Sequence, residues 1–284
     1  MTTYAITGAT GHFGQAAIKQ LKALAPADAT LIALARNTDK AAALVPDGVE
    51  VRQADYEQPV TLTAALQGVD KLLFVSSQPG GQLARAAQHQ NVVTAAKAAG
   101  VGYIAYTSFP HADTSTTPLA ADHRATEKMI EDAGIAHSFL RDNWYLENEV
   151  ATLAAGANGQ PFVYSAGAGQ AGWALEREYA EGAVRVLLTE TPQAIYEFSG
   201  APRTYADLAA AIDGNVQVVA VDDAAYQDGL EKSGLDAGTA ALVTSFQTLI
   251  RDGQLAGTTD DLATELGHPL TPLADAIKAV LATA

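Results

Sequence analysis

A short apolar segment that runs directly into closely spaced glycines is the feature that most constrains the fold. Residues 4–14 read YAITGATGHFG, with glycines at positions 8, 11 and 14. Gly8 lets the chain turn sharply at the end of a strand, Gly11 leaves room for a ligand to approach the backbone, and Gly14 lets the next helix pack closely. The first turn of that helix offers free N–H groups to a phosphate. The segment therefore predicts a strand–turn–helix unit that holds a dinucleotide, with an ordinary tight turn as the alternative.

The composition excludes several classes of protein and of site. With 284 residues, 48% of them hydrophobic, the chain can bury a large core, which excludes disordered and fibrous classes. It has no cysteine, so disulfides, thiolate catalysis and cysteine-ligated metals are excluded. The six histidines form no HExxH-type pair, and we expect no metal site.

The charge of the chain limits its partners. The formal net charge is −15, so the surface repels nucleic acid and anionic membranes. Because the sequence shows neither a signal-like segment nor a long apolar run, we expect a cytoplasmic protein that binds no nucleic acid and no membrane. A ligand that carries phosphates therefore needs a local positive pocket. A homodimer is left open.

Short apolar runs alternate with helical patterns along the first half of the chain. This alternation predicts an α/β Rossmann fold, in which helices cover both faces of a doubly wound parallel sheet. Ligands of such sheets bind at the carboxyl ends of the strands. After the first strand at 4–7, strands are expected at 31–35, 49–54, 71–76, 103–107 and 136–141, and helices at 13–24, 82–99 and 120–133.

The sequence changes character near residue 150, where a glycine-rich stretch, ANGQPFVYSAGAGQAG, begins at position 157. We expect residues 1–150 to form the dinucleotide-binding domain, to which a segment at about 176–198 returns. Residues 151–175 and 199–284 are expected to form a smaller, mostly helical substrate-binding domain that acts as a lid. Its short helices are expected at 207–212, 223–233, 239–251, 260–266 and 272–282.

The end of the second expected strand indicates which dinucleotide is preferred. NAD-dependent enzymes normally place an acidic side chain there to bind the ribose 2′-hydroxyl, whereas this strand ends at Arg36. A guanidinium can bind a 2′-phosphate through paired hydrogen bonds, and Lys40 lies one turn further on. The pattern predicts NADPH as the preferred cofactor; the alternative is an arginine that merely ends a surface strand.

Polar residues also follow the third and fourth strands, where the adenine and ribose groups should lie. Asp55 and Tyr56 follow the third strand, and Ser76, Ser77 and Gln78 follow the fourth. Asp55 can accept a hydrogen bond from the adenine amino group, and the serines can face the sugars. Each of these residue types is also common in ordinary turns.

Residues after the fifth and sixth strands are expected to meet near the nicotinamide. Aromatic rings there would stack against the nicotinamide and a flat substrate, which places the hydride donor over an electrophilic carbon. Core packing between sheet and lid is the alternative. The residues assigned to this region are Thr107, Ser108, Asn143, Trp144 and Tyr145, and the expected walls of the substrate pocket are Phe109, Trp144 and Trp173.

The proton donor of ordinary short-chain reductases has no counterpart in this sequence. Those enzymes use a Tyr followed four residues later by a Lys, whereas the corresponding window holds His123 and Glu127. The two share one helix face, and we favour a solvated helix pair over a catalytic dyad. Reduction of a ketone needs a proton donor, but reduction of a quinone gives a much weaker base. Water or His123 would then suffice.

Motifs along nearly the whole chain carry a family resemblance. In order they are GATGHFG, ALARN, VRQADY, GVDKLLFVSS, NVVTAAKAAGV, IAYTS, HAD, FLRDNWYLEN and LGHP. With these motifs the chain resembles NAD(P)H:quinone oxidoreductases of the NmrA-like, atypical short-chain reductase group. It is also similar to the triphenylmethane reductases of that group.

The resemblance implies a Rossmann domain with a small C-terminal domain, and hydride transfer from NADPH straight to a quinone without a flavin. The chain departs from these relatives at Leu175 and Glu176, where they carry a Thr-Arg pair, and this favours a larger or more apolar acceptor. The candidate catalytic residues are His123 and Tyr145. The implied NADPH-binding residues are Gly8, Thr10, Gly11, His12, Phe13 and Gly14 of the loop, then Arg36, Ser76 to Gln78, and Leu140, Arg141, Asn143, Trp144 and Tyr145.

Two hypotheses of different classes follow. The leading one is an NADPH-dependent oxidoreductase that reduces quinones or similar flat conjugated acceptors in one two-electron step. The alternative is a non-catalytic, NADP(H)-binding redox sensor of the NmrA type, which the missing Tyr and Lys leave open. A sugar-nucleotide epimerase on the same scaffold is disfavoured, because that chemistry needs the missing Tyr.

Overall fold

The computed structural model describes residues 1–78 and 81–283. The chain divides into two compact units. The first contains Met1–Asp142, Glu176–Phe198 and Asp261–Gly267; the second contains Asn143–Leu175, Ser199–Asp260 and the residues from His268 on.

The first unit is built on a parallel sheet, which confirms the predicted Rossmann fold. Over the described residues the sheet has seven strands in the order β3-β2-β1-β4-β5-β6-β8, so the order reverses between β1 and β4. Ligands of this fold bind at that reversal, beside the carboxyl ends of the strands. The strands are β1 (Thr3–Ile6), β2 (Thr30–Ala35), β3 (Glu50–Gln53), β4 (Lys71–Phe74), β5 (Tyr103–Ser108), β6 (Ala136–Asp142) and β8 (Ile195–Phe198).

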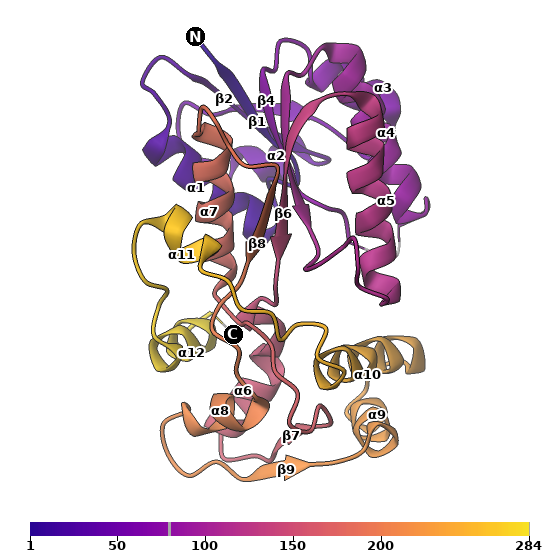
Figure 1. Cartoon of the computed structure of the whole chain (residues 1–284), viewed down its shortest axis with the longest axis vertical. Helices are drawn as coiled ribbons and strands as arrows, with labels where there is room; N and C mark the ends of the chain where they lie inside the picture. The colour runs from indigo at the N-terminus through magenta and orange to yellow at the C-terminus, as the bar shows by residue number, and fades with distance from the viewer. Residues whose placement is uncertain (79–80, 284) are drawn as a thin grey trace. The chain divides into compact units, whose positions relative to one another are not determined.

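Helices cover both faces of this sheet (Figure 1). Buried side chains between the sheet and the helices at residues 59–65, 85–99 and 118–133 form a large apolar core, which includes Ala5, Ile32, Val92 and Ile130. Local signals set the limits of the helix at residues 118–133. Pro118 is its first residue and follows the N-cap residue Thr117, and the helix ends at Gly134, which has a φ of +71°. One face carries α1 (His12–Leu24), α7 (Glu176–Leu188) and α11 (Asp261–Leu266), the other carries α3 (Pro59–Ala65), α4 (Arg85–Ala99) and α5 (Pro118–Ala133), and α2 (Thr38–Ala42) follows β2.

Two elements of the first unit differ from the sequence-based expectation. The segment 176–198 contributes a strand as well as a helix, because β8 pairs with β6 from Phe139 opposite Ile195 onward. The helix near 260 was expected in the lid, but α11 packs on α7 and β8 of the first unit. Both placements depend on contacts between segments far apart in the sequence, which local patterns do not reveal.

The second unit is mostly helical, as expected. It contains a two-stranded parallel sheet of β7 (Phe162–Tyr164) and β9 (Val218–Ala220). Its helices are the 3₁₀ turn η1 (Leu146–Glu149), α6 (Val150–Ala157), α8 (Tyr205–Ala210), α9 (Asp223–Lys232), α10 (Ala237–Arg251) and α12 (Leu273–Leu281). Across the residues described in both units, none of the helices has the length and apolar character needed to span a membrane.

Candidate active site

The corner between β1 and α1 requires glycine at two of its three positions. Gly8 has a φ of +63°, a backbone conformation that side chains disfavour. A Cβ on Gly14 would come within 2.2 Å of the Gly8 carbonyl oxygen, so only glycine lets the helix approach this closely. Gly11 has an ordinary φ of −80°, and a Cβ there would meet the same oxygen at 3.5 Å. No contact within the described part of the protein therefore requires glycine at position 11. The role of Gly11 in letting a ligand approach the backbone stays a prediction.

This corner opens into a cleft of about 580 Å³ in the first unit. The cleft brings together the ends of β1, β2, β3 and β4, as expected for a Rossmann fold. The apolar lining residues and the polar groups Glu57 and Gln88 were not anticipated from the sequence. Glu176, where the sequence departs from related reductases, also lines the cleft. Of the predicted cofactor-binding residues, Gly8, Thr10, Gly11, His12, Phe13, Gly14, Arg36, Asp55, Tyr56, Ser76, Ser77 and Gln78 line the cleft.

The predicted phosphate-binding cations both border the cleft. Arg36 follows β2, and Lys40 lies in α2, whose first turn is capped by the Asn37 side chain accepting from the Lys40 N–H at 2.8 Å. Both side chains are exposed and free to reach a ligand. In a chain with a net charge of −15, these two side chains bring positive charge to a cleft that is also lined by carboxylates, and binding of a 2′-phosphate by them stays a prediction.

The residues after β3 are held mainly by the protein. Asp55 accepts hydrogen bonds from the Glu57 N–H at 3.0 Å and from the Gln58 side chain at 3.0 Å. The Tyr56 hydroxyl donates to the Val75 carbonyl at 2.6 Å, and burial raises the pKa of this phenol. Tyr56 thus ties the end of β3 to the end of β4. Contact of either residue with a cofactor stays a prediction.

The loop after β4 is fixed by two neighbouring elements. The Ser76 N–H donates to the Thr107 hydroxyl oxygen on β5 at 2.9 Å, and the Ser77 N–H donates to His89 Nε2 on α4 at 3.0 Å. Because Nε2 accepts, the imidazole proton must sit on Nδ1, which faces the Thr126 hydroxyl at 2.8 Å. Burial and the nearby charge of Arg85 lower the pKa of His89 to about 3, so the ring is neutral.

His123 and Glu127 are not a solvated helix pair, and that interpretation is wrong. His123 and Glu127 are each only 6% exposed. His123 Nδ1 lies 3.0 Å from the Tyr106 hydroxyl, and burial is the main reason that the pKa of His123 is well below its ordinary value. His123 is therefore neutral. Glu127 turns to different partners, so the two residues do not work as a hydrogen-bonded dyad.

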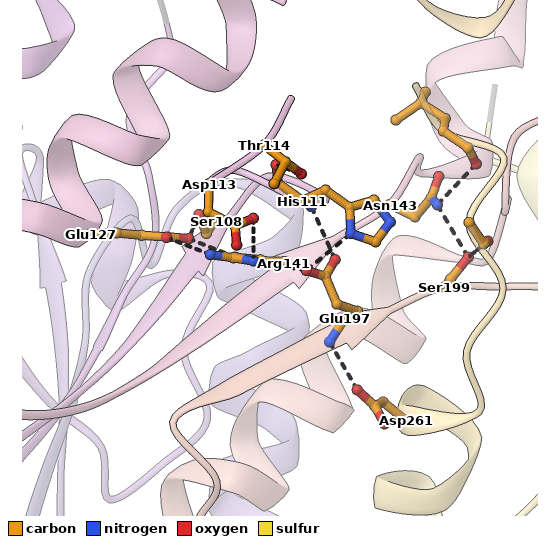
Figure 2. Close-up of polar contacts among 12 residues, drawn as sticks. Ser108, His111, Asp113, Thr114, Glu127, Arg141, Asn143, Glu197, Ser199 and Asp261 are labelled. Atoms are coloured by element: carbon orange, nitrogen blue, oxygen red, sulfur yellow. Dashed lines mark hydrogen bonds and ion pairs between the residues drawn. The ribbon is translucent and has the colours of Figure 1, made fainter. Parts of the chain in front are cut away.

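Those partners centre on Arg141, which is surrounded by carboxylates (Figure 2). Its guanidinium donates to both oxygens of Glu127 at 3.0 and 2.9 Å, to Asp113 at 3.0 Å and to Glu197 at 2.9 Å. Ser108 also donates to Glu127, at 2.6 Å. Burial alone would lower the pKa of Arg141, but its bonds to Glu127 and Glu197 outweigh burial and raise it. From β6 this guanidinium joins α5, β8 and the turn that follows β5, and four of its five N–H donors are used by these carboxylates.

The remaining residues assigned to the nicotinamide region fall in different units. Phe109 and Leu140 are buried in the first unit, while Asn143 and Tyr145 belong to the second. The Asn143 amide donates to the Ser199 hydroxyl at 3.1 Å (Figure 2) and to the Leu255 carbonyl at 3.1 Å. Asn143 thus braces its own unit, and Tyr145 precedes η1 as its N-cap residue.

Both tryptophans expected as substrate walls are anchored on one buried carboxylate of the second unit. Glu149 accepts from the indole N–H groups of Trp144 at 3.0 Å and Trp173 at 3.4 Å, and from the Tyr205 hydroxyl at 2.8 Å. Burial raises the pKa of Glu149, although these hydrogen bonds act in the opposite direction. Sequence reasoning missed Glu149, because an acidic residue at a helix start is normally exposed.

Comparison with known proteins adds independent information. The profile of the NAD(P)H-binding family matches residues 8–186. Quinone oxidoreductase 2 of Escherichia coli is 41% identical over 279 residues, which are 96% of either chain. The crystal structure of the NADPH-dependent quinone oxidoreductase from Escherichia coli, complexed with NADPH, has a TM-score of 0.90 and 40% identity, covering 98% of this chain and 99% of that one.

A second solved structure has a similar fold over the same length. The Citrobacter sp. triphenylmethane reductase complexed with NADP(H) has a TM-score of 0.91 and 35% identity, covering 98% of this chain and all of that chain. The family match spans more than half of the present sequence and starts at the first glycine of the βα corner. The chain therefore belongs to the NAD(P)H-binding family, within its NmrA-like, atypical short-chain reductase group.

Proposed function

We propose that the protein is an NADPH-dependent oxidoreductase that transfers a hydride directly to a quinone or a similar flat conjugated acceptor. The observation that carries this proposal is the βα corner, in which Gly8 and Gly14 are sterically required, opening into a cleft that is flanked by Arg36 and Lys40. The similarity to the NADPH-dependent quinone oxidoreductase of Escherichia coli supports the choice of acceptor.

The residues of the cleft fit NADPH. When bound, NADPH supplies the hydride. The corner of β1 and α1 presents backbone N–H groups to the pyrophosphate, and the bare Gly11 leaves space beside them. Arg36 and Lys40 would hold the 2′-phosphate, which NADH lacks. Ser76 and Ser77, fixed by Thr107 and His89, would orient the sugar on the nicotinamide side.

The state of the buried acid–base groups favours a quinone over a simple ketone. His123 is neutral and buried, and Glu127 is occupied by Arg141 and Ser108. Neither His123 nor Glu127 is therefore a strong acid available to a basic alkoxide. A hydroquinone anion is a much weaker base, and it can take its proton from water. Direct roles for His123 and Tyr145 in that proton transfer remain predictions.

The test is a spectrophotometric assay of purified protein without added flavin. Oxidation of NADPH at 340 nm should depend on both protein and quinone, and NADH should be a poorer donor. No turnover above a protein-free control, across quinones, azo dyes and triarylmethane dyes, would overturn the proposal. NADPH binding without turnover, together with discrimination between NADP⁺ and NADPH in a titration, would instead support the sensor.

We also propose that the protein is cytoplasmic and that two chains form a homodimer. Sedimentation of the purified protein, with and without NADPH, measures whether it is a monomer or a homodimer. Fractionation of the source cells tests the location. Neither result bears on the hydride-transfer proposal, which depends only on the cleft and its acceptor.

A further inference from the structure

Glu176, the first residue of α7, places a carboxylate in the cleft. The residue is partly buried, and the ligand proposed for the cleft carries phosphates, which a carboxylate repels. Asp55 and Glu57, the other carboxylates among the described lining residues, both follow β3. Asp55 accepts a hydrogen bond from the Glu57 N–H at 3.0 Å. Glu57 accepts from the Leu83 N–H at 3.1 Å and from the Gln88 side chain at 3.3 Å, so both carboxylates hold the loops beside them.

Contacts at the far end of α7 fix where its first residue lies. The Lys71 ammonium, at the start of β4, donates to the Leu187 carbonyl at 3.1 Å and to the Thr189 carbonyl at 2.9 Å. At rises of about 1.5 Å per helical residue and about 3.3 Å per strand residue, Glu176 lies about 17 Å from Leu187, and Ser76 lies about 17 Å from Lys71. Because α7 packs along β4, Glu176 lies beside the carboxyl end of that strand.

The neighbouring helix α1 gives a second reference point. The Gln20 side chain of α1 donates to Glu181 of α7 at 3.1 Å. The two helices pack side by side on one face of the sheet and run in the same direction (Figure 1). Five residues back from Glu181 is Glu176, and five residues back from Gln20 is Gln15, in the first turn of α1. Glu176 is therefore level with the start of α1, on the β4 side of it.

The charges of the cleft divide between its two halves. Dinucleotide-binding sheets consist of two halves that meet where the strand order reverses, here between β1 and β4. The half with β2 and β3 holds the adenosine part, and Arg36 and Lys40 belong to it, so the half with β4 is left for the nicotinamide nucleotide. Among the described lining residues, Glu176 is the one Lys, Arg, Asp or Glu on this second half. Arg177, next in α7, and Arg85, first in α4, do not line the cleft.

The nicotinamide half is also where the charge of the cofactor changes. NADPH and NADP⁺ carry the same phosphates, but the nicotinamide ring is neutral in NADPH and positive in NADP⁺. A nearby carboxylate repels the phosphates equally in both states and attracts only the oxidised ring. Its effect on the ring is therefore isolated by the ratio of the two dissociation constants.

We propose that Glu176 determines the preference for the oxidation state of the cofactor, by favouring NADP⁺ over NADPH. This inference rests on the proposed function. When NADPH gives a hydride to the acceptor, a C–H bond of the dihydronicotinamide breaks, both of its electrons leave with the hydrogen nucleus, and the ring becomes positive. A carboxylate that stabilises the positive ring makes this transfer more favourable.

The test measures Kd for NADPH and for NADP⁺ by isothermal titration calorimetry, without an acceptor. Glu176→Gln should lower the ratio of Kd for NADPH to Kd for NADP⁺ by about tenfold, the scale of one charge acting over several ångströms in a partly solvated site. Glu176→Lys should lower that ratio further, and Glu176→Asp should keep most of it. The Kd for NADPH itself should stay the same or fall in Glu176→Gln, because repulsion of the phosphates is also lost.

The matched control is Glu190→Gln, which removes an exposed carboxylate just beyond the other end of α7 and should leave the ratio unchanged. An unchanged ratio in Glu176→Gln, with both Kd values moving together or neither moving, would overturn the inference. So would an equal effect of Glu190→Gln. Thermal melts of each cofactor-free variant establish that it is folded.

Failure of the proposed function gives a different result. Wild-type protein that binds both cofactor states but reduces no acceptor would overturn the oxidoreductase proposal, while the ratio in Glu176→Gln would still decide the role of Glu176. Wild-type protein that binds neither state would overturn both.

Discussion

Gly11 and Gly14 are alike in the sequence but meet different surroundings, and this difference can be measured. Gly14→Ala should lower the unfolding free energy of the cofactor-free protein by about 1–3 kcal/mol, because its Cβ would fall 2.2 Å from the Gly8 oxygen. Gly11→Ala should leave that free energy unchanged but weaken NADPH binding by at least about tenfold, or about 1.4 kcal/mol. Urea unfolding and fluorescence titration check the pair. Unchanged affinity in Gly11→Ala would mean that the ligand does not approach this backbone.

The preference for a phosphorylated cofactor is also decided at single residues. Arg36→Ala removes a charged donor expected at the 2′-phosphate, worth about 1.5–3 kcal/mol, so the Kd for NADPH should rise about ten- to a hundredfold. The Kd for NADH should barely change, since NADH has no such phosphate. Lys128→Ala, at a side chain that is 71% exposed on α5, is the control and should alter neither Kd. An equal rise in the Kd values for NADPH and NADH in Arg36→Ala would show instead that Arg36 supports the fold and does not bind the 2′-phosphate.

At the scale of elements, what the sequence predicts depends on whether the signal is local. The β1–α1 corner, the cations after β2 and the serines after β4 follow strand ends that apolar runs mark, and they meet in one cleft. The carboxylates around Arg141 could not be foreseen, because α5, β6 and β8 supply partners from distant segments. For the same reason the favoured interpretation of His123 and Glu127 was wrong: their shared helix face is buried.

The cluster around Glu149 shows what such a non-local contact contributes. Glu149→Ala would leave two indole N–H groups and the Tyr205 hydroxyl without their acceptor, in surroundings that exclude water. We expect the unfolding free energy to fall by about 3 kcal/mol or more, the scale for removing one partner of a buried charged network. Glu231→Ala, at an exposed residue of α9, should change it by less than about 0.5 kcal/mol. Chemical denaturation measures both, and equal effects would contradict the anchoring role.

The same cluster predicts a pH dependence with a definite sign. Burial raises the pKa of the Glu149 carboxyl above its ordinary value, so Glu149 binds its proton more tightly in the folded protein than in the unfolded chain. The stability from this group is then fully present below the unfolded pKa and is lost as the pH rises through the folded pKa. Glu149→Gln cannot ionise, so this loss should be absent from the variant. As the pH rises through that range, the unfolding free energy of the wild type should therefore fall relative to that of Glu149→Gln. A difference that stays constant with pH would show that Glu149 does not titrate there.

At the scale of the whole molecule, hydrogen exchange can show which of the two units binds NADPH. The cleft is lined by residues of the first unit, so NADPH should stabilise that unit directly. A ligand at a hundred times its Kd contributes about 2.7 kcal/mol to the state that binds it. Backbone amides of the β1–α1 corner, of α2 and of the loop after β4 should therefore exchange more slowly once NADPH is added.

The pattern of that protection separates binding in the cleft from binding elsewhere. Arg36→Ala, at equal NADPH concentration, should show less protection at α2, because a larger Kd leaves fewer molecules occupied. The amides of β7 and β9, which belong to the second unit, serve as the internal reference. Protection confined to the second unit would contradict the assignment of the cleft, since no residue of that unit is among those that line it in the described part of the chain.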